Sequence, residues 1–449
     1  MLATPLEHDI DLRKFLIWIA VAETIMLALL LRSESVSFGF FLLLFVPFFI
    51  YLYPEFGFGI ALTGNILLKV VFDYVQVGIP YPQLIAYFLL ISMGVFFYWH
   101  KQSLNMVVLT SLLFRLMLLI TAVMLFGLLY STNRSYGIYK ITFYFIYNFT
   151  MFMVASLYYK DFRGIEKLLS FAFLLGLLLA VISFVIKTDT IYAFARFRPS
   201  DSVNPIFLAR SLGVSILCSF FFLSKFKRSL PKILLLLSYG LLLSPIIWSG
   251  SRAPFLGLFF AAIIFYLLQP SQTTRRKMWV SFICIICVVL FMLYSASQVT
   301  ARITTPIAQE ASAAFRVLAW FQGLQDFLGS PLLGIGTGSF FLDTPWIPLI
   351  YPHNLILEMA CENGLLGLAA ILSFIGLTAI LGLRNIRFYH QNNQEIPLQL
   401  SITVFSIFAY TLWNSMFSGD ISTNPVIWFA AGLINVLYQS KNSQSIQGS

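Results

Sequence analysis

Charged residues are scarce in this chain of 449 residues, of which Asp, Glu, Lys and Arg make up only 10% while hydrophobic residues make up 59%. Soluble domains carry about 25% charged residues on average, so the composition excludes an ordinary soluble enzyme. Apolar stretches of about 20 residues, long enough to cross a bilayer core, recur from one end of the chain to the other. The sequence therefore predicts an all-α polytopic membrane protein with about 12–14 transmembrane helices.

Cysteine is rare as well. The four cysteines, Cys218, Cys284, Cys287 and Cys361, lie within or beside apolar stretches, which argues against a disulfide framework. Cys284 and Cys287 are spaced like half of a metal site, but no second pair or partner histidine completes it. We expect all four to be buried as small apolar side chains.

Acidic residues are the scarcer charge, 18 against 28 Lys and Arg. In a soluble protein this excess would point to nucleic acid, but membrane topology explains most of it, so we expect no nucleic-acid partner. No P-loop or other nucleotide motif occurs. The outer carboxylates Asp189, Asp201, Glu310, Asp326 and Asp343 lack metal-ligand spacing. We therefore expect metal-independent chemistry without a cofactor, in which arginine supplies the positive charge.

Long apolar segments are abundant. Lys and Arg concentrate in alternate connections, such as 225–232 and 270–277, which places both termini in the cytoplasm by the positive-inside rule. The first segment lacks a small-residue cleavage site, so we expect it to be a retained span. The predicted spans are residues 15–31, 37–53, 57–77, 83–99, 105–129, 140–159, 165–186, 205–224, 232–248, 254–269, 278–297, 354–383, 398–417 and 421–438.

The chain is expected to divide into N-terminal transmembrane helices, 1–195, and a C-terminal part, 196–449, which holds the long outer segment 298–352. A connection of this length is uncommon without structure or function of its own. From Arg316 to Leu328 its apolar residues recur at helical spacing, which predicts an amphipathic helix at the membrane interface. The glycines of 329–340 then suit tight turns or close backbone approach.

Cationic groups gather on the predicted outer face. Arg210, Arg252 and Arg316 would bind phosphate oxygens in two-point geometry. His353 is the only one of four histidines that the topology places outside the cytoplasmic side, and nearby arginines would keep it neutral, as a general base must be. Just below the surface lie Asn354, Glu358 and Glu362.

Simpler roles remain open for these residues. A single outer arginine often binds a lipid headgroup. Asn354 could bond the amides of the first helical turn. Glu358 and Glu362, four residues apart on one helical face, could pair with Arg210 or Arg115, and Arg115, which has no local partner, should face the protein interior or a polar cavity.

Four segments in this order resemble the O-antigen ligase/polymerase superfamily: "NPIFLARSLG" (204–213), "SGSRAPFLG" (249–257), "GSPLLGIGTGSF" (329–340) and "PHNLILEMACENGLLG" (352–367). The resemblance covers roughly residues 198–372. The positions that match the family pattern are Arg252, Arg316, Gly334, Gly336, Gly338, His353, Asn354, Glu362, Gly364 and Gly367.

The resemblance implies a membrane glycosyltransferase of the GT-C type in the bacterial inner (cytoplasmic) membrane, with its active site facing the periplasm. Its donor would be an undecaprenyl-diphosphate-linked glycan, and its acceptor a glycan or lipid A-core hydroxyl. Arg252 and Arg316 would neutralise the diphosphate leaving group, and His353 would activate the acceptor. Arg210, Asn354 and Glu362 would contribute to substrate binding. Single-step attack would invert the anomeric carbon.

Two alternatives to a polymerase stay open. A ligase would move the glycan onto lipid A-core; the polymerase is favoured slightly because the tail after the last span is short and no acceptor-binding domain is visible. A solute transporter or its subunit is the other class, with Lys69, Asp73 and Arg115 lining a path. A transporter should show repeated halves or paired broken helices, and the sequence has no convincing internal repeat.

Overall fold

The computed structural model describes residues 54–64, 66–67, 69–70, 106–158, 162–185, 203–226, 229–270, 311–344 and 348–447. Within these ranges the chain is helical, and its only β contact is an isolated bridge between Leu342 and Leu349. The elements are α3 (Pro54–Gly59), η1 (Ile60–Gly64), η2 (Met106–Thr110), α6 (Leu112–Leu128), α7 (Arg134–Phe143), η3 (Tyr144–Phe149), α8 (Thr150–Tyr158), α9 (Phe162–Val185), α10 (Pro205–Lys225), α11 (Ser229–Trp248), α12 (Arg252–Leu267), α15 (Ala311–Gly329), α16 (Leu355–Gln391), α17 (Glu395–Ser415), η5 (Ile421–Thr423) and α18 (Pro425–Gln447).

Six helical stretches of the described part are long and apolar enough to cross a membrane: Arg134–Leu157, α9, α10, α11, α16 and α17. Two shorter apolar helices, α6 and α12, accompany them. The prediction of an all-α polytopic membrane protein is confirmed, and α9, α10, α11, α12 and α17 agree with predicted spans to within about three residues. The other bounds differ more: α6 begins later than the predicted span 105–129, the stretch Arg134–Leu157 begins before the predicted span 140–159, and α16 extends past residue 383. The predicted spans 15–31, 37–53, 83–99 and 278–297 lie outside the described residues.

Small residues allow the helices to approach closely. Gly176 of α9 faces Ser215 of α10, where a Cβ on the glycine would lie 1.8 Å from the serine Oγ. That hydroxyl donates a hydrogen bond of 3.0 Å to the carbonyl of Ala172. Gly432 of α18 packs in the same way against Ala155 of α8. Such contacts are typical of membrane helices, which associate through close packing and interhelical hydrogen bonds.

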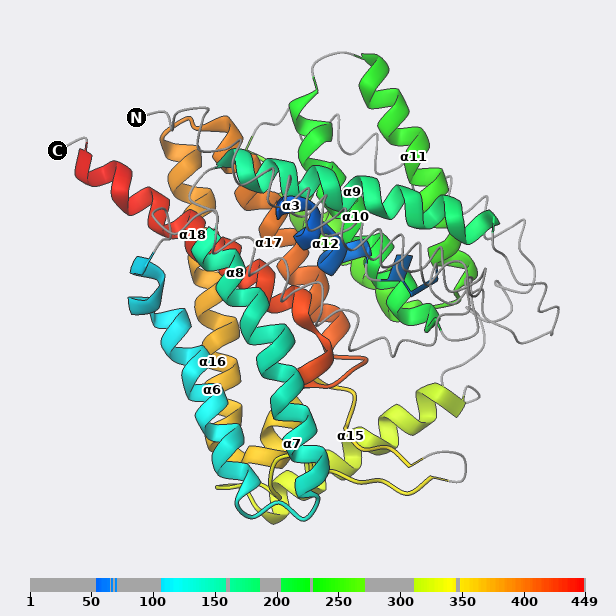
Figure 1. The fold of residues 1–449 in the computed structure, drawn as a ribbon, viewed down its shortest axis with the longest axis vertical. Helices are drawn as coiled ribbons and strands as arrows, with labels where there is room; N and C mark the ends of the chain where they lie inside the picture. Colours follow the sequence, from blue (N-terminus) through cyan, green and yellow to red (C-terminus); the bar gives the residue numbers. More distant parts are fainter. Residues whose placement is uncertain are drawn as a thin grey trace, which may run out of the picture.

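Several connections meet at one end of the bundle, which we call the loop end. It contains the turn 129–133, the loop residues 330–344 and 348–354, the turn 416–424 and the first residues of α10 and α12. The amide of Thr132 donates to Ser339 Oγ (2.9 Å), and the Trp413 indole donates to the Ala253 carbonyl (3.0 Å). In Figure 1, α15 and the yellow loop after it lie at the foot of the molecule, beside the start of α7.

Two predictions about single residues can be checked here. Arg115 is exposed on α6, so the expectation that it faces the protein interior is wrong, and it does not line an interior path. Cys218 and Cys361 are buried free thiols, as expected. Asp73, Cys284 and Cys287 lie outside the described residues.

Candidate functional site

The site begins at a break in α16. Gly364 has φ 61° and ψ −153°, so residues 355–363 form a short helix separate from the long one that follows. A Cβ at Gly364 would lie 2.3 Å from the carbonyl oxygen of Leu332, and such a φ is accessible mainly to glycine. The amide of Leu365, beyond the break, donates to the carbonyl of Pro331 (2.7 Å). The break therefore accommodates another part of the chain.

That part is the glycine loop, residues 329–340. Its Ile335 and Gly336 amides donate to the carbonyls of Cys361 and Glu362, both at 2.9 Å. Gly334, Gly336 and Gly338 all have positive φ, at 73°, 99° and 78°. The prediction of tight turns and close backbone approach is confirmed, because these glycines press the loop onto the broken helix.

A buried ion cluster lies beneath the loop. The ammonium of Lys140 is 2.8 Å from Glu358 Oε1 and 2.7 Å from Glu362 Oε1. The second carboxylate oxygens accept backbone N–H groups, Glu362 from Gly338 and Glu358 from Ile421, each at 2.9 Å. The expectation that the two glutamates pair with Arg210 or Arg115 is therefore wrong. Their partner is a lysine that is 0% exposed.

The cluster extends to the turn before α18. Tyr136 donates its phenolic proton to Asp420 Oδ2 (3.0 Å). Asp420 Oδ1 accepts the amides of Ser422 and Thr423 at the start of η5. Sequence reasoning missed Lys140, Tyr136 and Asp420. The one available signal was a lysine at the start of an apolar segment, which needs a partner inside the protein.

Two predicted substrate-binding residues are engaged by the protein itself. Asn354 is the N-cap of α16 and accepts the amide of Leu357 at 3.0 Å, as in the simpler role considered for it. Glu362 is 1% exposed, and each of its carboxylate oxygens has a partner. The described contacts of both residues hold the loop end together, and contact with a substrate stays a prediction.

Arg252 and Arg316 line one cavity of about 310 Å³. Arg252 is the first residue of α12, and Arg316 lies on α15, the amphipathic helix that the sequence predicts. Trp320, Trp413 and Phe417 supply aromatic walls. We call this space the paired-arginine cavity. Two guanidinium groups beside apolar walls suit an anion carried on an apolar chain.

His353 lies in the loop immediately before Asn354, with a positive φ of 58°. Its ring packs edge-on against Tyr351 at 4.5 Å between centroids. Among the described residues nothing hydrogen-bonds its buried Nδ1. Burial, together with the positive charges of Arg316 and Arg210 and against the opposing charge of Asp420, lowers the pKa of His353 to about 4. The imidazole is therefore neutral at pH 7, which is the form that accepts a proton.

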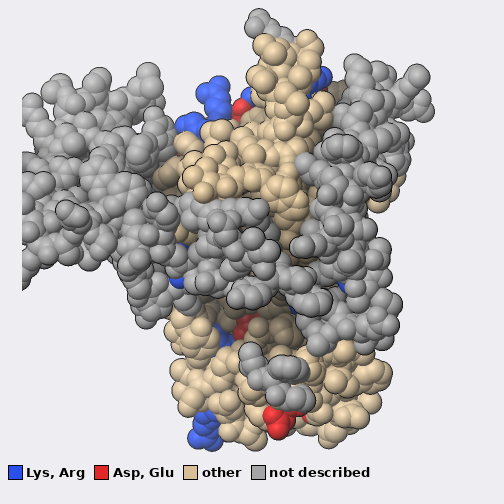
Figure 2. Space-filling model, turned by 90° about the vertical axis from the view of Figure 1, so that its right-hand side faces the viewer, with Lys and Arg blue, Asp and Glu red and all other residues tan. Residues whose placement is uncertain are grey.

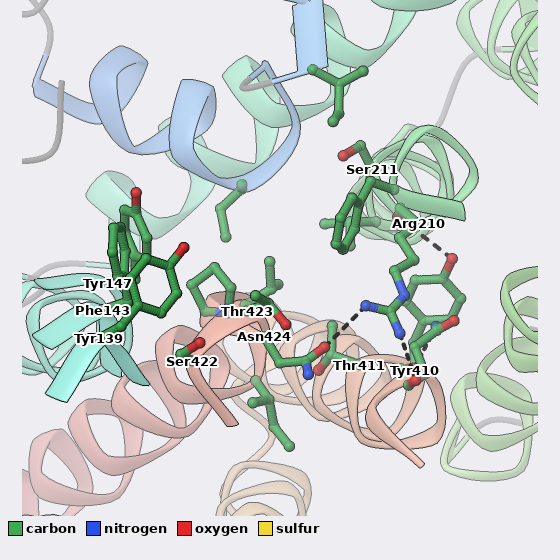
Figure 3. Close-up of a pocket in the computed structure, with 18 residues that line it drawn as sticks. Tyr139, Phe143, Tyr147, Arg210, Ser211, Tyr410, Thr411, Ser422, Thr423 and Asn424 are labelled. Carbon is green, nitrogen blue, oxygen red and sulfur yellow. Dashed lines mark hydrogen bonds between the residues drawn. The ribbon is translucent and has the colours of Figure 1, made fainter. Parts of the chain in front are cut away.

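Arg210 lines a different cavity, of about 280 Å³. Its guanidinium donates to Asn424 Oδ1 (3.0 Å) and to the carbonyls of Asn414 (2.6 Å) and Ser418 (2.9 Å). Ser418 also lines the paired-arginine cavity, so the two spaces adjoin. Figure 3 shows Arg210 on one side of the second cavity and three aromatic rings on the other.

The structure thus brings the predicted cations to one end of the bundle but distributes them over two cavities. Arg252 and Arg316 share one, Arg210 lines the other, and His353 lies within electrostatic range of Arg210 and Arg316. Figure 2 shows the molecule from the side, and atoms of basic and acidic residues are visible at the floor of a recess in its lower half.

Fold and site together define a multi-pass membrane protein with arginine-lined cavities and a neutral histidine at its loop end. Residues 234–372 match the family described as O-antigen ligase, which confirms the resemblance to the O-antigen ligase/polymerase superfamily. The matched segment contains Arg252, Arg316 and His353, whereas Lys140 and Arg210 precede it. No curated protein matches the chain. The family supports membrane glycan transfer of the O-antigen ligase/polymerase type.

Proposed function

We propose that this protein is a GT-C-type glycosyltransferase that moves a glycan from a polyprenyl diphosphate to an acceptor hydroxyl. The observation that carries the proposal is the paired-arginine cavity. Arg252 and Arg316 come from distant parts of the sequence yet line the same space, and His353 lies within electrostatic range of Arg316. The family match covers all three residues.

In the proposed reaction the guanidinium groups of Arg252 and Arg316 bind the diphosphate and neutralise the charge that develops as it leaves. The bond between the anomeric carbon and the diphosphate oxygen breaks while the acceptor oxygen bonds to that carbon from the opposite side. His353 takes the acceptor proton. A positioned base contributes about 10²–10⁴-fold to such a rate, and one charge-stabilising donor about 10²–10³-fold. Orientation of the two substrates supplies much of the rest.

The aromatic walls fit the same substrate. Trp320, Trp413 and Phe417 form a connected set, with ring centroids 5.9 Å apart for Trp320 and Phe417 and 5.2 Å apart for Trp413 and Phe417. Such walls can bury the first isoprenoid units, while the arginines hold the diphosphate. The site would face the outside of the bacterial inner membrane.

A transfer assay with purified protein in lipid nanodiscs tests the proposal. One lipid-linked repeat is supplied with or without a lipid A-core acceptor, and products are sized. Arg252→Ala and His353→Ala should each reduce transfer by at least about 10²-fold. Arg134→Ala is the matched control, because Arg134 is exposed at the same end of the bundle and donates to the Leu129 carbonyl. Wild-type transfer rates in both site variants would overturn the proposal.

The same assay separates polymerase from ligase. A polymerase lengthens the lipid-linked glycan without any other acceptor, whereas a ligase forms product only when the lipid A-core is present. Solute transport, the other class, would survive Arg252→Ala and His353→Ala.

A further inference from the structure

The cavity at Arg210 has a different character from the buried ion cluster, although both contain a cation among apolar helices. Lys140 is compensated by two carboxylates at 2.7 and 2.8 Å. Among the described residues, Arg210 donates to neutral oxygens, those of Asn424, Asn414 and Ser418. No described carboxylate forms an ion pair with Arg210. Arg210 is half-buried, and a cation among apolar helices is costly without an anion, so an anion bound in its cavity would stabilise it.

Arg210 retains the capacity to bind such an anion. Its Nε is buried and has no hydrogen-bond partner among the described residues. Its two terminal nitrogens are fixed by contacts to the end of α17 and to the turn 416–424. A guanidinium held in this way is already oriented, so less conformational entropy is lost when an anion binds.

The wall opposite Arg210 is apolar and aromatic. Tyr139, Phe143 and Tyr147 form a ladder along α7 and η3, with centroids 4.2 Å apart for Tyr139 and Phe143 and 5.3 Å apart for Phe143 and Tyr147. Their rings face the cavity across from the guanidinium (Figure 3). A free phosphate would leave this wall without a partner, whereas a phosphate on an apolar chain would cover it.

We propose that the Arg210 cavity is a second lipid-phosphate site, which holds the phosphate and first chain segment of a lipid-linked acceptor beside the donor in the paired-arginine cavity. The inference rests on the proposed function, and it narrows the acceptor to an amphipathic anion. The two cavities adjoin at Ser418, whose carbonyl accepts from Arg210 while the residue lines the paired-arginine cavity. Two lipid anions bound in this way would hold their glycans near each other and near His353.

Two membrane lipids share this chemistry. An isoprenoid diphosphate acceptor would make the protein a polymerase, since donor and acceptor would then be of one kind. An acylated phosphate acceptor would make it a ligase. Both place an anion at Arg210 and a hydrocarbon chain against the aromatic ladder.

The test counts bound lipid on the full-length protein by native mass spectrometry, with farnesyl diphosphate as the probe. Wild type and the control Arg134→Gln should bind two molecules. Arg210→Gln should weaken one of the two by about 10- to 100-fold, the effect of losing one charge-assisted hydrogen bond. Because Arg210 also holds the turn 416–424, Tyr139→Ala serves as a second variant; this ring is 45% exposed, and its removal should weaken the same molecule.

The outcomes separate the two proposals. In one outcome, wild type binds a single molecule, the double variant Arg252→Ala/Arg316→Ala loses it, and Arg210→Gln and Tyr139→Ala both keep it. This outcome refutes the second site and leaves the proposed function standing. If the one molecule is lost in Arg210→Gln and kept in Arg252→Ala/Arg316→Ala, the second site stands and the donor site is refuted. Binding of none refutes both.

Competition identifies the source of the ligand. If inorganic pyrophosphate displaces the Arg210-dependent molecule as effectively as farnesyl diphosphate does, the aromatic wall does not contribute to binding. That result would refute a lipid site. Displacement by phosphatidic acid would support the site and assign it to an acyl lipid. Resistance to phosphatidic acid, with binding of farnesyl diphosphate retained, would support the site and assign it to an isoprenoid.

Discussion

Replacing Lys140 with methionine should destabilise the protein far more than any surface substitution. Methionine keeps much of the apolar stem and removes only the ammonium. Glu358 and Glu362 would then remain buried, each with a single backbone N–H donor, from Ile421 and from Gly338. Both carboxylates now lie within 2.8 Å of one nitrogen, so without it they face each other across a short gap.

The size of the effect follows from burial. Removing one partner of a buried ion pair costs about 3–5 kcal/mol, because the other charge is left uncompensated. Lys140 is 0% exposed and compensates two carboxylates, so we expect a loss of at least about 3 kcal/mol. Neutralising the glutamates in the same background, with Glu358→Gln and Glu362→Gln, should restore most of it, because a wholly uncharged cluster leaves no buried charge unpaired.

Unfolding of the purified protein in detergent with increasing dodecyl sulfate, followed by circular dichroism, measures these differences. Arg115→Met is the control, since Arg115 is exposed on α6 and its loss should change the free energy of unfolding by about 0.5 kcal/mol or less. If Lys140→Met costs no more than this control, or if the triple variant is no more stable than Lys140→Met alone, the account of the ion cluster is wrong.

As the pH falls, kcat/KM should decrease only near pH 4, because the lowered pKa of His353 keeps the imidazole neutral down to that pH. A pH–rate profile in which kcat/KM decreases near pH 6.5 would contradict this. The decrease in kcat should lie at a higher pH, since bound diphosphate raises the pKa. Gly364→Ala should lower the free energy of unfolding by about 1–3 kcal/mol, because the position has a positive φ and contacts Leu332. Gly376→Ala on the same helix, with open space around the residue, should not lower it. Equal effects of the two substitutions in detergent unfolding would refute the packing role of Gly364. Asn354→Ala should cost about 1 kcal/mol and Asn354→Ser much less, by the same measurement, and equal losses would exclude capping.

Much of the fold was predictable because it depends on local pattern. Apolar runs of spanning length located the helices from α9 to α12, and helical periodicity located α15, whose bounds Ala311–Gly329 enclose the predicted segment. The cap at Asn354 was also foreseeable, because a capping bond joins residues three positions apart. Arg252 and Arg316 could be selected because both lie on the predicted outer face, at positions that match the family pattern.

Partners could not be predicted, because long-range contacts leave no trace in spacing along the chain. The sequence is compatible with Arg210 or Arg115 as the partner of Glu358 and Glu362. The packing of α7 against the broken α16 and the glycine loop brings Lys140 to these glutamates instead. The sequence alone determined that this is a helical membrane protein, and it predicted which arginines and which histidine belong to the candidate site. The tertiary structure decided that Glu358 and Glu362 compensate Lys140, and that Arg252 and Arg316 line one cavity while Arg210 lines another, because these arrangements depend on distances between atoms that the sequence does not contain.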